Sequence, residues 1–518
     1  MSLSLAAVLA EAAQRYPDRT ATILGTERTS YADLWAQARR YAAVLRDRGV
    51  GPGDRVALLV PNVTDFPRLY YGALALGAVV VPVHALLTAD EIAYVLRDSG
   101  ARLLAAAGPL VDTGAKAAEL AGIPLLATMV PPGAAPGAAL DRVEDAAAAL
   151  APVDSYLAGD PSDDAVILYT SGTTGRPKGA VLSHLNLVLN ATLAATDVVA
   201  LRPGEDVILG CLPLFHSFGQ TCTMNAGFRA GATVVLMPRF DGTAALELMA
   251  AHGVTVFQGV PTMYLGLLDA VAHGATPVPL RIACSGGASL PVAVIDRFAE
   301  VFGADILEGY GLSETSPVAT FNQQVYGRRP GSVGHAIWGV DVEVARAEVE
   351  ERIELLPRGE LGEIVIRGHN VMTRYHNNPE ATAGALVDGW FRTGDLGTKG
   401  ADGFVTIVDR KKDMVLRGGF NVYPREVEEV LARHPAVAQV AVIGLPDPTY
   451  GEEVCAVVRP AGDAEGSAEL AAEIVTWSRQ HLGGHKYPRQ VRFVTEFPLG
   501  PSGKVLKREL VARYRAAD

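Results

Sequence analysis

A short polar stretch between two apolar runs is the first place in this sequence where chemistry can be located. Residues 168–184 read LYTSGTTGRPKGAVLSH, with three glycines, several hydroxyl side chains and Lys178. Glycines allow consecutive backbone amides to point into one concavity, which binds anions, and hydroxyl and ammonium groups add contacts to phosphate oxygens. We therefore expect a phosphate-binding loop. Its predicted members are Thr170, Ser171, Gly172, Thr173, Thr174, Gly175 and Lys178.

This loop does not have the spacing of a Walker A motif. Counting from Gly172, Pro177 stands where that motif requires its second glycine. Gly179 follows Lys178 where the motif requires a serine or threonine. The phosphate chemistry is therefore predicted without assigning the chain to the P-loop proteins.

Several further motifs occur in a fixed order along the chain, and together they carry a resemblance to a known family. The stretch YTSGTTGRPKG resembles the signature of the acyl-adenylate-forming superfamily, which includes acyl-CoA synthetases, peptide-synthetase adenylation domains and luciferases. The likeness covers essentially the whole chain. The other matching motifs are LPLFHSFG (212–219), CSGGASL (284–290), EGYGLSETSP (308–317), GWFRTGDLG (389–397), DRKKDMVLRGGFNVYPREVE (409–428) and PSGKVLKREL (501–510).

The resemblance implies a reaction in two steps. A carboxylate attacks the α-phosphate of ATP, giving acyl-AMP and pyrophosphate, and a thiol then attacks the mixed anhydride. Two anions meet in the first step, so the site must neutralise charge more than it must supply a nucleophile. The resemblance implies Lys504 as the catalytic lysine, Glu314 with Thr170 as ligands of Mg²⁺, and His216 beside the substrate carboxylate.

The same resemblance implies a nucleotide site and a moving second domain. Tyr310 offers a face for adenine, and Asp395 with Arg410 would hold the ribose. Lys412 is implied as the hinge, and the pair Gly418 and Gly419 as the place where the pantetheine arm of CoA passes. The implied nucleotide contacts are Gly287, Ala288, Glu308, Gly309, Tyr310, Gly311, Thr315, Asp395, Arg410 and Lys504.

The elements that must hold these motifs follow from hydrophobic patterning. Apolar runs at 56–60, 79–83 and 102–107 alternate with helical stretches, which predicts βαβ units and a parallel sheet. Thr88 and Glu91 have the spacing of a capping box before one of these helices. After Glu343 short strands with glycine punctuation predict an antiparallel subdomain. The predicted fold class is therefore α/β.

We expect two domains, with a boundary next to the hinge. Residues 1–409 would form a large N-terminal domain of parallel helix-flanked sheets with the small antiparallel subdomain, binding ATP and the acyl group. Residues 410–518 would form a small mobile α+β domain that carries the hinge and Lys504.

Composition excludes several classes of function. The net charge of -12 and pI near 5.5 argue against a nucleic-acid partner. Four cysteines without CxxC spacing fit reduced thiols in the cytoplasm. The N-terminal stretch lacks a basic region typical of a signal peptide, and the longest apolar run is too short to span a membrane. The oligomeric state stays open, a homodimer included.

The leading interpretation is an AMP-forming acyl-CoA synthetase that uses ATP, Mg²⁺ and coenzyme A on a small carboxylic acid. The wall expected for the acyl pocket, from 215 to 224, 286 to 288 and 309 to 316, contains small and apolar residues and no arginine. This favours a monocarboxylic acid with an apolar tail, a medium- or long-chain fatty acid first and an aryl acid of the 4-coumarate kind second.

Three other interpretations stay open. An acyl-AMP ligase that loads a carrier protein is one, although the insertion typical of its fatty-acyl members is not seen near the hinge. A luciferase-like oxygenase shares the motifs, and a nucleotide sensor without turnover belongs to another class. A metallo- or serine hydrolase is disfavoured because the sequence contains neither HExxH nor GxSxG.

Overall fold

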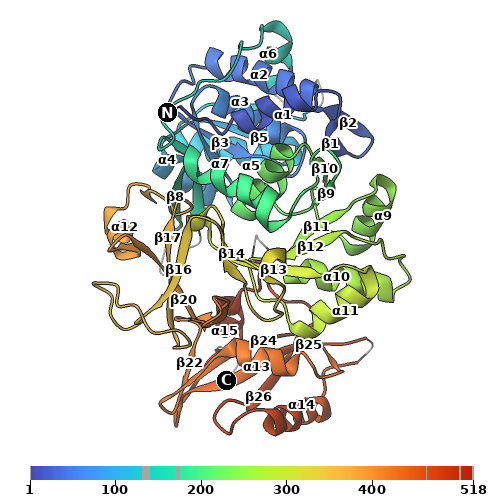
Figure 1. Ribbon diagram of the computed structural model, residues 1–518, viewed down its shortest axis with the longest axis vertical. Helices are drawn as coiled ribbons and strands as arrows, with labels where there is room; N and C mark the ends of the chain where they lie inside the picture. The colour runs from blue at the N-terminus through green and yellow to red at the C-terminus, as the bar shows by residue number, and fades with distance from the viewer. Residues whose placement is uncertain (1, 131–140, 171–175, 463, 501–502, 516–518) are drawn as a thin grey trace.

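The computed structural model describes residues 2–130, 141–170, 176–462, 464–500 and 503–515. Figure 1 shows a large N-terminal lobe, coloured blue to yellow, above a small C-terminal lobe in orange and red. Ser171, Gly172, Thr173, Thr174 and Gly175 of the predicted phosphate loop lie outside the described residues. The strands on both sides of them are described.

The first sheet of the large lobe is mainly parallel, as the alternation of apolar runs and helices predicts. The pairs β3–β4, β3–β5, β5–β6 and β4–β7 are parallel, whereas β8 and β18 add an antiparallel edge. In spatial order its described strands are β18 (Arg374–Tyr375), β8 (Lys178–Ser183), β7 (Asp164–Thr170), β4 (Val79–Pro82), β3 (Arg55–Leu59), β5 (Ala101–Ala107) and β6 (Leu125–Thr128).

The second sheet is also parallel at its centre and antiparallel at both edges. The edge pairs are β1–β2 at one side and β13–β14–β15 at the other. Its described strands, in spatial order, are β15 (His335–Ala336), β14 (Val318–Phe321), β13 (Ile306–Gly311), β12 (Ile282–Ser285), β11 (Val256–Gly259), β9 (Val207–Gly210), β10 (Thr233–Leu236), β1 (Thr20–Leu24) and β2 (Glu27–Ser30).

Helices cover these sheets, and α4 shows how local sequence sets their ends. Thr88 accepts from the backbone N–H of Glu91 (3.4 Å), while Glu91 Oε2 accepts from Thr88 N (2.8 Å), so the predicted capping box is confirmed. The described α-helices of this lobe are α1 (Ala7–Arg15), α2 (Tyr31–Asp47), α3 (Asp65–Ala75), α4 (Ala89–Ser99), α5 (Val111–Ala121), α6 (Val143–Ala149), α7 (His184–Leu193), α8 (Ala226–Arg229), α9 (Gly242–His252), α10 (Pro261–Ala272), α11 (Val292–Phe302) and α12 (Pro379–Ala385). The described 3₁₀-helical segments are η1 (Gly108–Leu110), η4 (Ser313–Thr315) and η5 (Gln324–Tyr326). The described π-helical segments are η2 (Ala194–Val198) and η3 (Phe218–Asn225).

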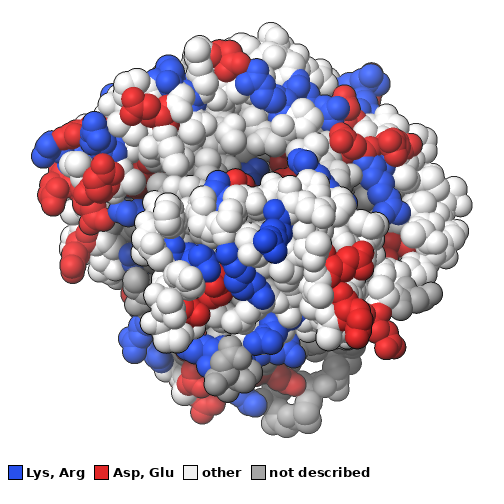
Figure 2. All heavy atoms as spheres, turned by 90° about the horizontal axis from the view of Figure 1, so that it is seen from below, with Lys and Arg blue, Asp and Glu red and all other residues white. Residues whose placement is uncertain are grey.

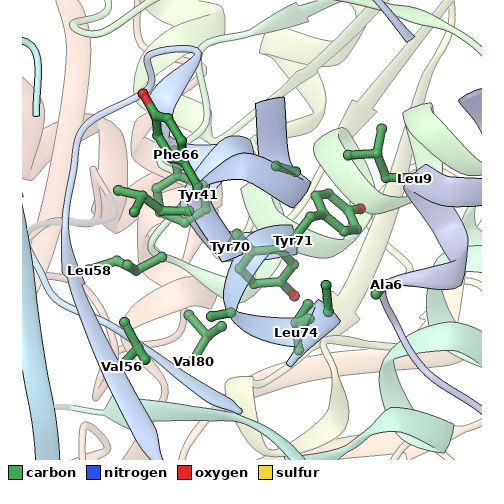
Figure 3. Packing of buried hydrophobic residues seen from close by; sticks show 14 of the residues in the cluster. Ala6, Leu9, Tyr41, Val56, Leu58, Phe66, Tyr70, Tyr71, Leu74 and Val80 are labelled. Atoms are coloured by element: carbon green, nitrogen blue, oxygen red, sulfur yellow. The ribbon is translucent and has the colours of Figure 1, made fainter. Parts of the chain in front are cut away.

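The largest core lies where α3 packs on the first sheet. Figure 3 shows Tyr70, Tyr71 and Leu74 of α3 among Val56, Leu58 and Val80 of the strands, and all six are fully or nearly fully buried. Burying one large apolar side chain contributes about 1.5–3 kcal/mol, so this layer anchors α3 firmly. The hydroxyls of Tyr70 and Tyr71 reach Gln220 (3.2 Å) and Asn225 (2.7 Å), which ties the core to η3.

A third, antiparallel sheet completes the large lobe, as the sequence after Glu343 predicts. Its described strands are β16 (Val340–Ala345), β17 (Gly362–Gly368), β20 (Trp390–Lys399), β19 (Leu386–Val387) and β21 (Val405–Arg410), with β21 paired to β20. Arg410 still belongs to β21, and the next strand begins at Val415. The predicted division at residues 409 and 410 therefore falls at the last residues of this sheet.

The small lobe combines a sheet with helices on its surface. Its described strands, in spatial order, are β23 (Phe420–Val422), β22 (Val415–Arg417), β25 (Gly451–Pro460) and β24 (Val437–Asp447), and β26 (Gln490–Phe493) also pairs with β25. Its described helices are α13 (Pro424–Leu431), α14 (Ala468–His481) and α15 (Lys507–Arg515). Pro424 opens α13, as expected from its fixed φ. Figure 2 shows this lobe from below, with Lys and Arg interspersed among Asp and Glu.

The predicted fold class agrees with this architecture. The parallel strands, the antiparallel subdomain and the small α+β lobe all form where the sequence predicts them. Within the described part of the chain, no helix is both long enough and apolar enough to cross a membrane.

Candidate functional site

Lys504 of the small lobe lies against the large lobe, next to a glycine turn that follows β12. A Cβ placed on Gly287 would stand 3.3 Å from Lys504 Cε, so the lysine chain runs over the backbone of this residue, whose φ is +82°. Thr262 of α10 donates to the carbonyl of Gly503 (3.2 Å) and fixes the approach. Contact between the two lobes therefore brings Lys504 to its place.

The Lys504 ammonium lies near both positively and negatively charged side chains. Burial and the charge of Arg410 together lower the pKa of Lys504 to about 8. Asp395 and Glu314 raise this pKa in opposition, which means that both carboxylates lie near the ammonium. The structure thus gathers these four charged groups, which are spread over nearly two hundred residues of sequence.

Glu314 stands at the junction of the two sheets. Its side chain is buried, and Oε1 accepts from the hydroxyl of Tyr375 (2.8 Å) and from that of Thr170 (3.4 Å). Thr170 ends β7, immediately before the undescribed loop, and Lys178 opens β8 just after it. The Lys178 ammonium lies over the ring of Tyr375, 5.3 Å from its centroid. The predicted phosphate loop is therefore framed by a carboxylate, a hydroxyl and an ammonium.

The donors around Glu314 fit a hard cation that also binds phosphate. Magnesium is held in proteins by one or two carboxylates together with phosphate and water oxygens. Over the residues that the structure describes, His, Cys, Asp and Glu side chains form no group of three that could hold a metal alone. One carboxylate and one hydroxyl beside a phosphate loop match that requirement.

The turn that follows β13 is closed by Thr315. Thr315 is fully buried, and its hydroxyl donates to the carbonyl of Pro317 (2.6 Å) and accepts from Leu312 N (2.9 Å). The hydroxyl therefore helps to shape the turn, and its nucleotide contact stays a prediction. Gly311 has a similar role, because a Cβ there would meet Pro317 O at 1.7 Å. Ser313, which sequence reasoning passed over, is the partly exposed hydroxyl residue next to Glu314.

Tyr310, Asp395 and Arg410 form a connected group on three strands. The Tyr310 hydroxyl donates to Asp395 Oδ2 (2.6 Å), and Arg410 Nε lies 3.2 Å from Asp395 Oδ1. Burial raises the pKa of Asp395 above its ordinary value, although Arg410 and Tyr310 counteract this. The predicted ribose residues are therefore adjacent, and they meet the predicted adenine residue.

Three other predicted nucleotide residues lie on or next to neighbouring strands of the second sheet: Glu308 and Gly309 belong to β13, and Ala288 follows β12. Gly309 packs under Phe321, whose ring a Cβ would meet at 2.2 Å, while Ala288 is exposed beside Gly287. Glu308 is buried and accepts from Gly331 N (3.2 Å). Burial raises the pKa of Glu308 to about 7, and the charge of Arg425 from the small lobe opposes the rise.

His216 occupies an apolar corner near Lys504. Burial, together with the charges of Lys504 and His84, lowers the pKa of His216 to about 3, so the ring is neutral. His84, which follows β4, contacts the ring of Phe215 (centroids 4.4 Å apart). Burial lowers the pKa of His84 to about 4. A histidine pair beside the expected acyl pocket was not predicted, because a single histidine after an apolar strand carries no signal.

The predicted thiol-channel glycines lie apart from this group, whereas the predicted hinge residue lies beside it. Partial burial and the charge of Arg410 lower the pKa of Lys412, and the charge of Asp395 opposes this change. Gly418 and Gly419 form the exposed turn between β22 and β23, with φ of +57° and +84°. Gly418 N donates to Tyr450 O (2.8 Å), a contact within the small lobe. Lys412 is exposed just after β21. The structure therefore holds the arrangement with Lys504 at the nucleotide residues and the glycine pair away from them.

Comparison with known proteins agrees with this geometry. The AMP-binding enzyme family matches residues 9–376, and the AMP-binding enzyme C-terminal domain matches residues 426–504. A long-chain-fatty-acid–CoA ligase of Bacillus subtilis (strain 168) is 35% identical over 98% of this chain and 94% of its own length. A feruloyl-CoA synthase of an Amycolatopsis species is 38% identical over 97% of each chain. A crystal structure of a benzoate CoA ligase from Burkholderia xenovorans LB400 superposes with a TM-score of 0.89, at 31% identity over 98% of this chain and 99% of that one.

Proposed function

Because the chain belongs to the AMP-binding enzyme family and is an AMP-forming acid–CoA ligase, we propose that it activates a monocarboxylic acid with an apolar tail and transfers it to coenzyme A. The carboxylate displaces pyrophosphate from ATP to give acyl-AMP. The CoA thiol then displaces AMP to give the thioester. The observation that carries the proposal is the Lys504 ammonium, held between the lobes close to Glu314 and Asp395.

In the first step, Lys504 neutralises the two anions that react. The carboxylate and the α-phosphate repel each other, and an ammonium in a water-poor site stabilises the charge that develops at phosphorus more strongly than water does. Glu314 and Thr170 would hold Mg²⁺, which supplies further positive charge to the phosphate oxygens when it is bound. Lys178 and the amides of the adjoining loop would bind the remaining phosphates.

Asp395, Arg410 and Tyr310 would hold the nucleoside. The Asp395 carboxylate accepts hydrogen bonds and is already aligned by its two partners, so the ribose hydroxyls meet a preorganised acceptor. The ring of Tyr310 would contact adenine. Gly287 and Ala288 have no side chain or a small one, so adenine could approach their backbone closely. His216, neutral at working pH, would orient the acid and not remove a proton from it.

The second step requires the small lobe to turn about Lys412. Lys504 then leaves, and the exposed turn of Gly418 and Gly419 would reach the acyl-AMP and let the pantetheine arm pass. The thiolate sulfur bonds to the acyl carbon as the bond to AMP breaks. A carrier-protein thiol is the alternative acceptor, and an assay with free CoA separates the two.

The lowered pKa of Lys504 predicts the pH dependence of the first step. Below pH of about 8 the ammonium is charged, and as pH rises through that value the charge and its stabilisation are lost. We expect kcat/KM for ATP in pyrophosphate release to fall about tenfold for each pH unit well above 8. Thioester formation from preformed acyl-AMP serves as the control and should not fall in parallel. A flat profile for the first step up to pH 10 would contradict the assignment.

The acid itself is proposed from the walls of the site. A fatty acid is the first candidate, in line with the Bacillus relative. One observation favours the second, an aromatic acid. Along η3, all residues from Gly219 to Asn225 are buried, and Thr223 donates to Gln258 Oε1 (2.6 Å) in the layer beneath. These buried polar contacts lie behind the wall expected for the acyl pocket, and from them we infer less depth for a long tail than for a compact ring.

An assay of thioester formation over saturated acids of graded length, with benzoate and 4-coumarate alongside, tests the proposal. We expect turnover with acids that carry an apolar tail, fatty or aromatic, and a loss of kcat/KM of about tenfold or more once added methylenes no longer fit, since each misfit costs about 1–3 kcal/mol. A preference for malonate or for amino acids would refute the proposed substrate class. The cytoplasmic location and the homodimer stay predictions, and the proposed chemistry depends on neither.

A further inference from the structure

The carboxylate of Asp395 is presented by an irregular segment of β20. Where β20 pairs with β17, Arg392 faces Val365 and Leu396 faces Glu363, so three residues of β20 lie opposite Ile364 alone. These three, residues 393–395, are called the 393–395 bulge below. Its central residue is Gly394, whose φ of +72° favours glycine. Bulges of this kind re-aim a side chain out of the regular alternation of a strand.

A buried side chain of the neighbouring strand holds the bulge. Glu363 Oε1 accepts from Gly394 N (3.0 Å), and Oε2 accepts from Arg392 Nε (3.2 Å) and Nη2 (2.6 Å). The side chains of Glu363 and Arg392 are only 4% and 7% exposed. A single carboxylate therefore satisfies the backbone at the tip of the bulge and the guanidinium that flanks it.

The remaining contacts of the bulge connect this carboxylate to Asp395. Thr393 donates from its hydroxyl to Ile364 O (2.7 Å) and accepts from Asp395 N (3.0 Å). The backbone on both sides of Gly394 is thus pinned, and the direction of the Asp395 side chain follows from it. Neither Glu363 nor Arg392 is assigned a role in binding by any motif discussed above.

We infer that Glu363 is a positioning residue for the nucleotide: through Gly394 it shapes the 393–395 bulge and so aims the Asp395 carboxylate at the ribose. The inference rests on the proposed function, because it presumes that Asp395 binds ATP. Glu363 itself touches no substrate. A carboxylate that served only to neutralise Arg392 would affect stability alone, whereas a positioning carboxylate also affects the apparent affinity for ATP.

Two substitutions at Glu363 separate these roles. Both Glu363→Ala and Glu363→Gln remove the charge opposite Arg392, so both lower the melting temperature. Only the glutamine keeps an oxygen that can accept from Gly394 N. We expect Glu363→Ala to raise KM for ATP about tenfold or more with KM for the acid unchanged, since small misplacements of binding groups have large kinetic effects. Glu363→Gln should restore most of that loss.

A matched control is the buried pair Asp206–Arg281 of the same lobe (2.7 Å), away from the nucleotide residues. Asp206→Ala should lower the melting temperature and leave KM for ATP unchanged. If Glu363→Ala is too unstable to purify, Thr393→Val removes the two hydroxyl contacts of the bulge without touching the ion pair and should raise KM for ATP in the same way. The Thr393 hydroxyl also hydrogen-bonds with Tyr310, which this variant loses as well.

The outcomes are distinguishable. An unchanged KM for ATP in Glu363→Ala or Thr393→Val, or an equal rise of KM for ATP and for the acid, overturns the inference while wild-type activity still supports the proposed function. If the wild-type enzyme releases no pyrophosphate with any acid, the proposed function itself is refuted. Equal loss in the alanine and glutamine variants also overturns the inference.

Discussion

Replacing Lys504 by alanine is expected to lower the rate of acyl-AMP formation by about 10²–10³-fold or more, which is the effect of removing one preorganised charge-stabilising group. Among the described residues of the small lobe, Lys504 is the one whose side chain lies over Gly287, so the substitution removes the ammonium at this position. The measurement is single-turnover pyrophosphate release with saturating ATP and acid. Thioester formation from preformed acyl-AMP should keep most of its rate, since Lys504 leaves the site before that step.

Lys507 provides a control for this substitution. It stands three residues further along the same lobe and pairs with Glu428 (2.7 Å). Lys507→Ala removes an equal charge and should leave acyl-AMP formation within about a few-fold of wild type, because an ion pair of this kind contributes mainly to local stability. Equal losses in the two variants would show that a general charge effect, and not the place of Lys504, controls the first step.

Lys412→Pro is expected to produce the opposite selectivity, with acyl-AMP formation spared and thioester formation reduced by about 10²-fold or more. Proline restricts φ to about −65° and so prevents a backbone rotation at that residue. The rotation is placed at Lys412 because the chain is tied to the large lobe up to Lys411. The Lys411 N–H donates to Gly394 O (2.9 Å), and its ammonium reaches Ala347 O (2.8 Å) and Glu350 (2.9 Å).

The two half-reactions of Lys412→Pro should be measured separately, by pyrophosphate release without CoA and by CoA thioester formation from acyl-AMP. Lys412→Ala, which leaves φ free, is the matched control and should behave as wild type in both. If Lys412→Pro loses both half-reactions equally, with an unchanged melting temperature, Lys412 is not the hinge.

Much of the fold was predictable because local signals and burial agree. The runs at 56–60, 79–83 and 102–107 are apolar apart from Arg102, which is the pattern of strands buried on both faces, and they form β3, β4 and β5. The order of the strands was not predictable. The pairing of β1 with β10 joins segments two hundred residues apart, and no local pattern encodes such a contact.

Those residues of the site that lie within glycine-containing sequence motifs were predictable. Lys504, Glu314, Asp395, Tyr310 and Arg410 were named from their motifs, and the structure brings them together. Their roles stay proposals. The hydrogen bonds of Thr315 within its turn could not be predicted, because a hydroxyl next to Glu314 gives the same sequence signal whether it faces the ligand or closes its own turn.

The supporting residues were missed for a different reason. Glu363 directly precedes the apolar residues 364–366 in GEIVIRG. A buried charge within a strand indicates that the charge has a specific partner. The identity of that partner, Arg392 with Gly394, depends on the register of β17 and β20. Tyr375 likewise reaches Glu314 only because β18 pairs with β8.

The most direct test of the account is isotope exchange between pyrophosphate and ATP in the absence of CoA. The account predicts exchange by the wild-type enzyme that depends on a monocarboxylic acid with an apolar tail and on Mg²⁺, exchange close to wild type in Lys412→Pro, and almost none in Lys504→Ala. Full exchange in Lys504→Ala, or exchange by the wild type that needs CoA, would contradict the claim that an ammonium delivered by the small lobe allows two anions to react at phosphorus.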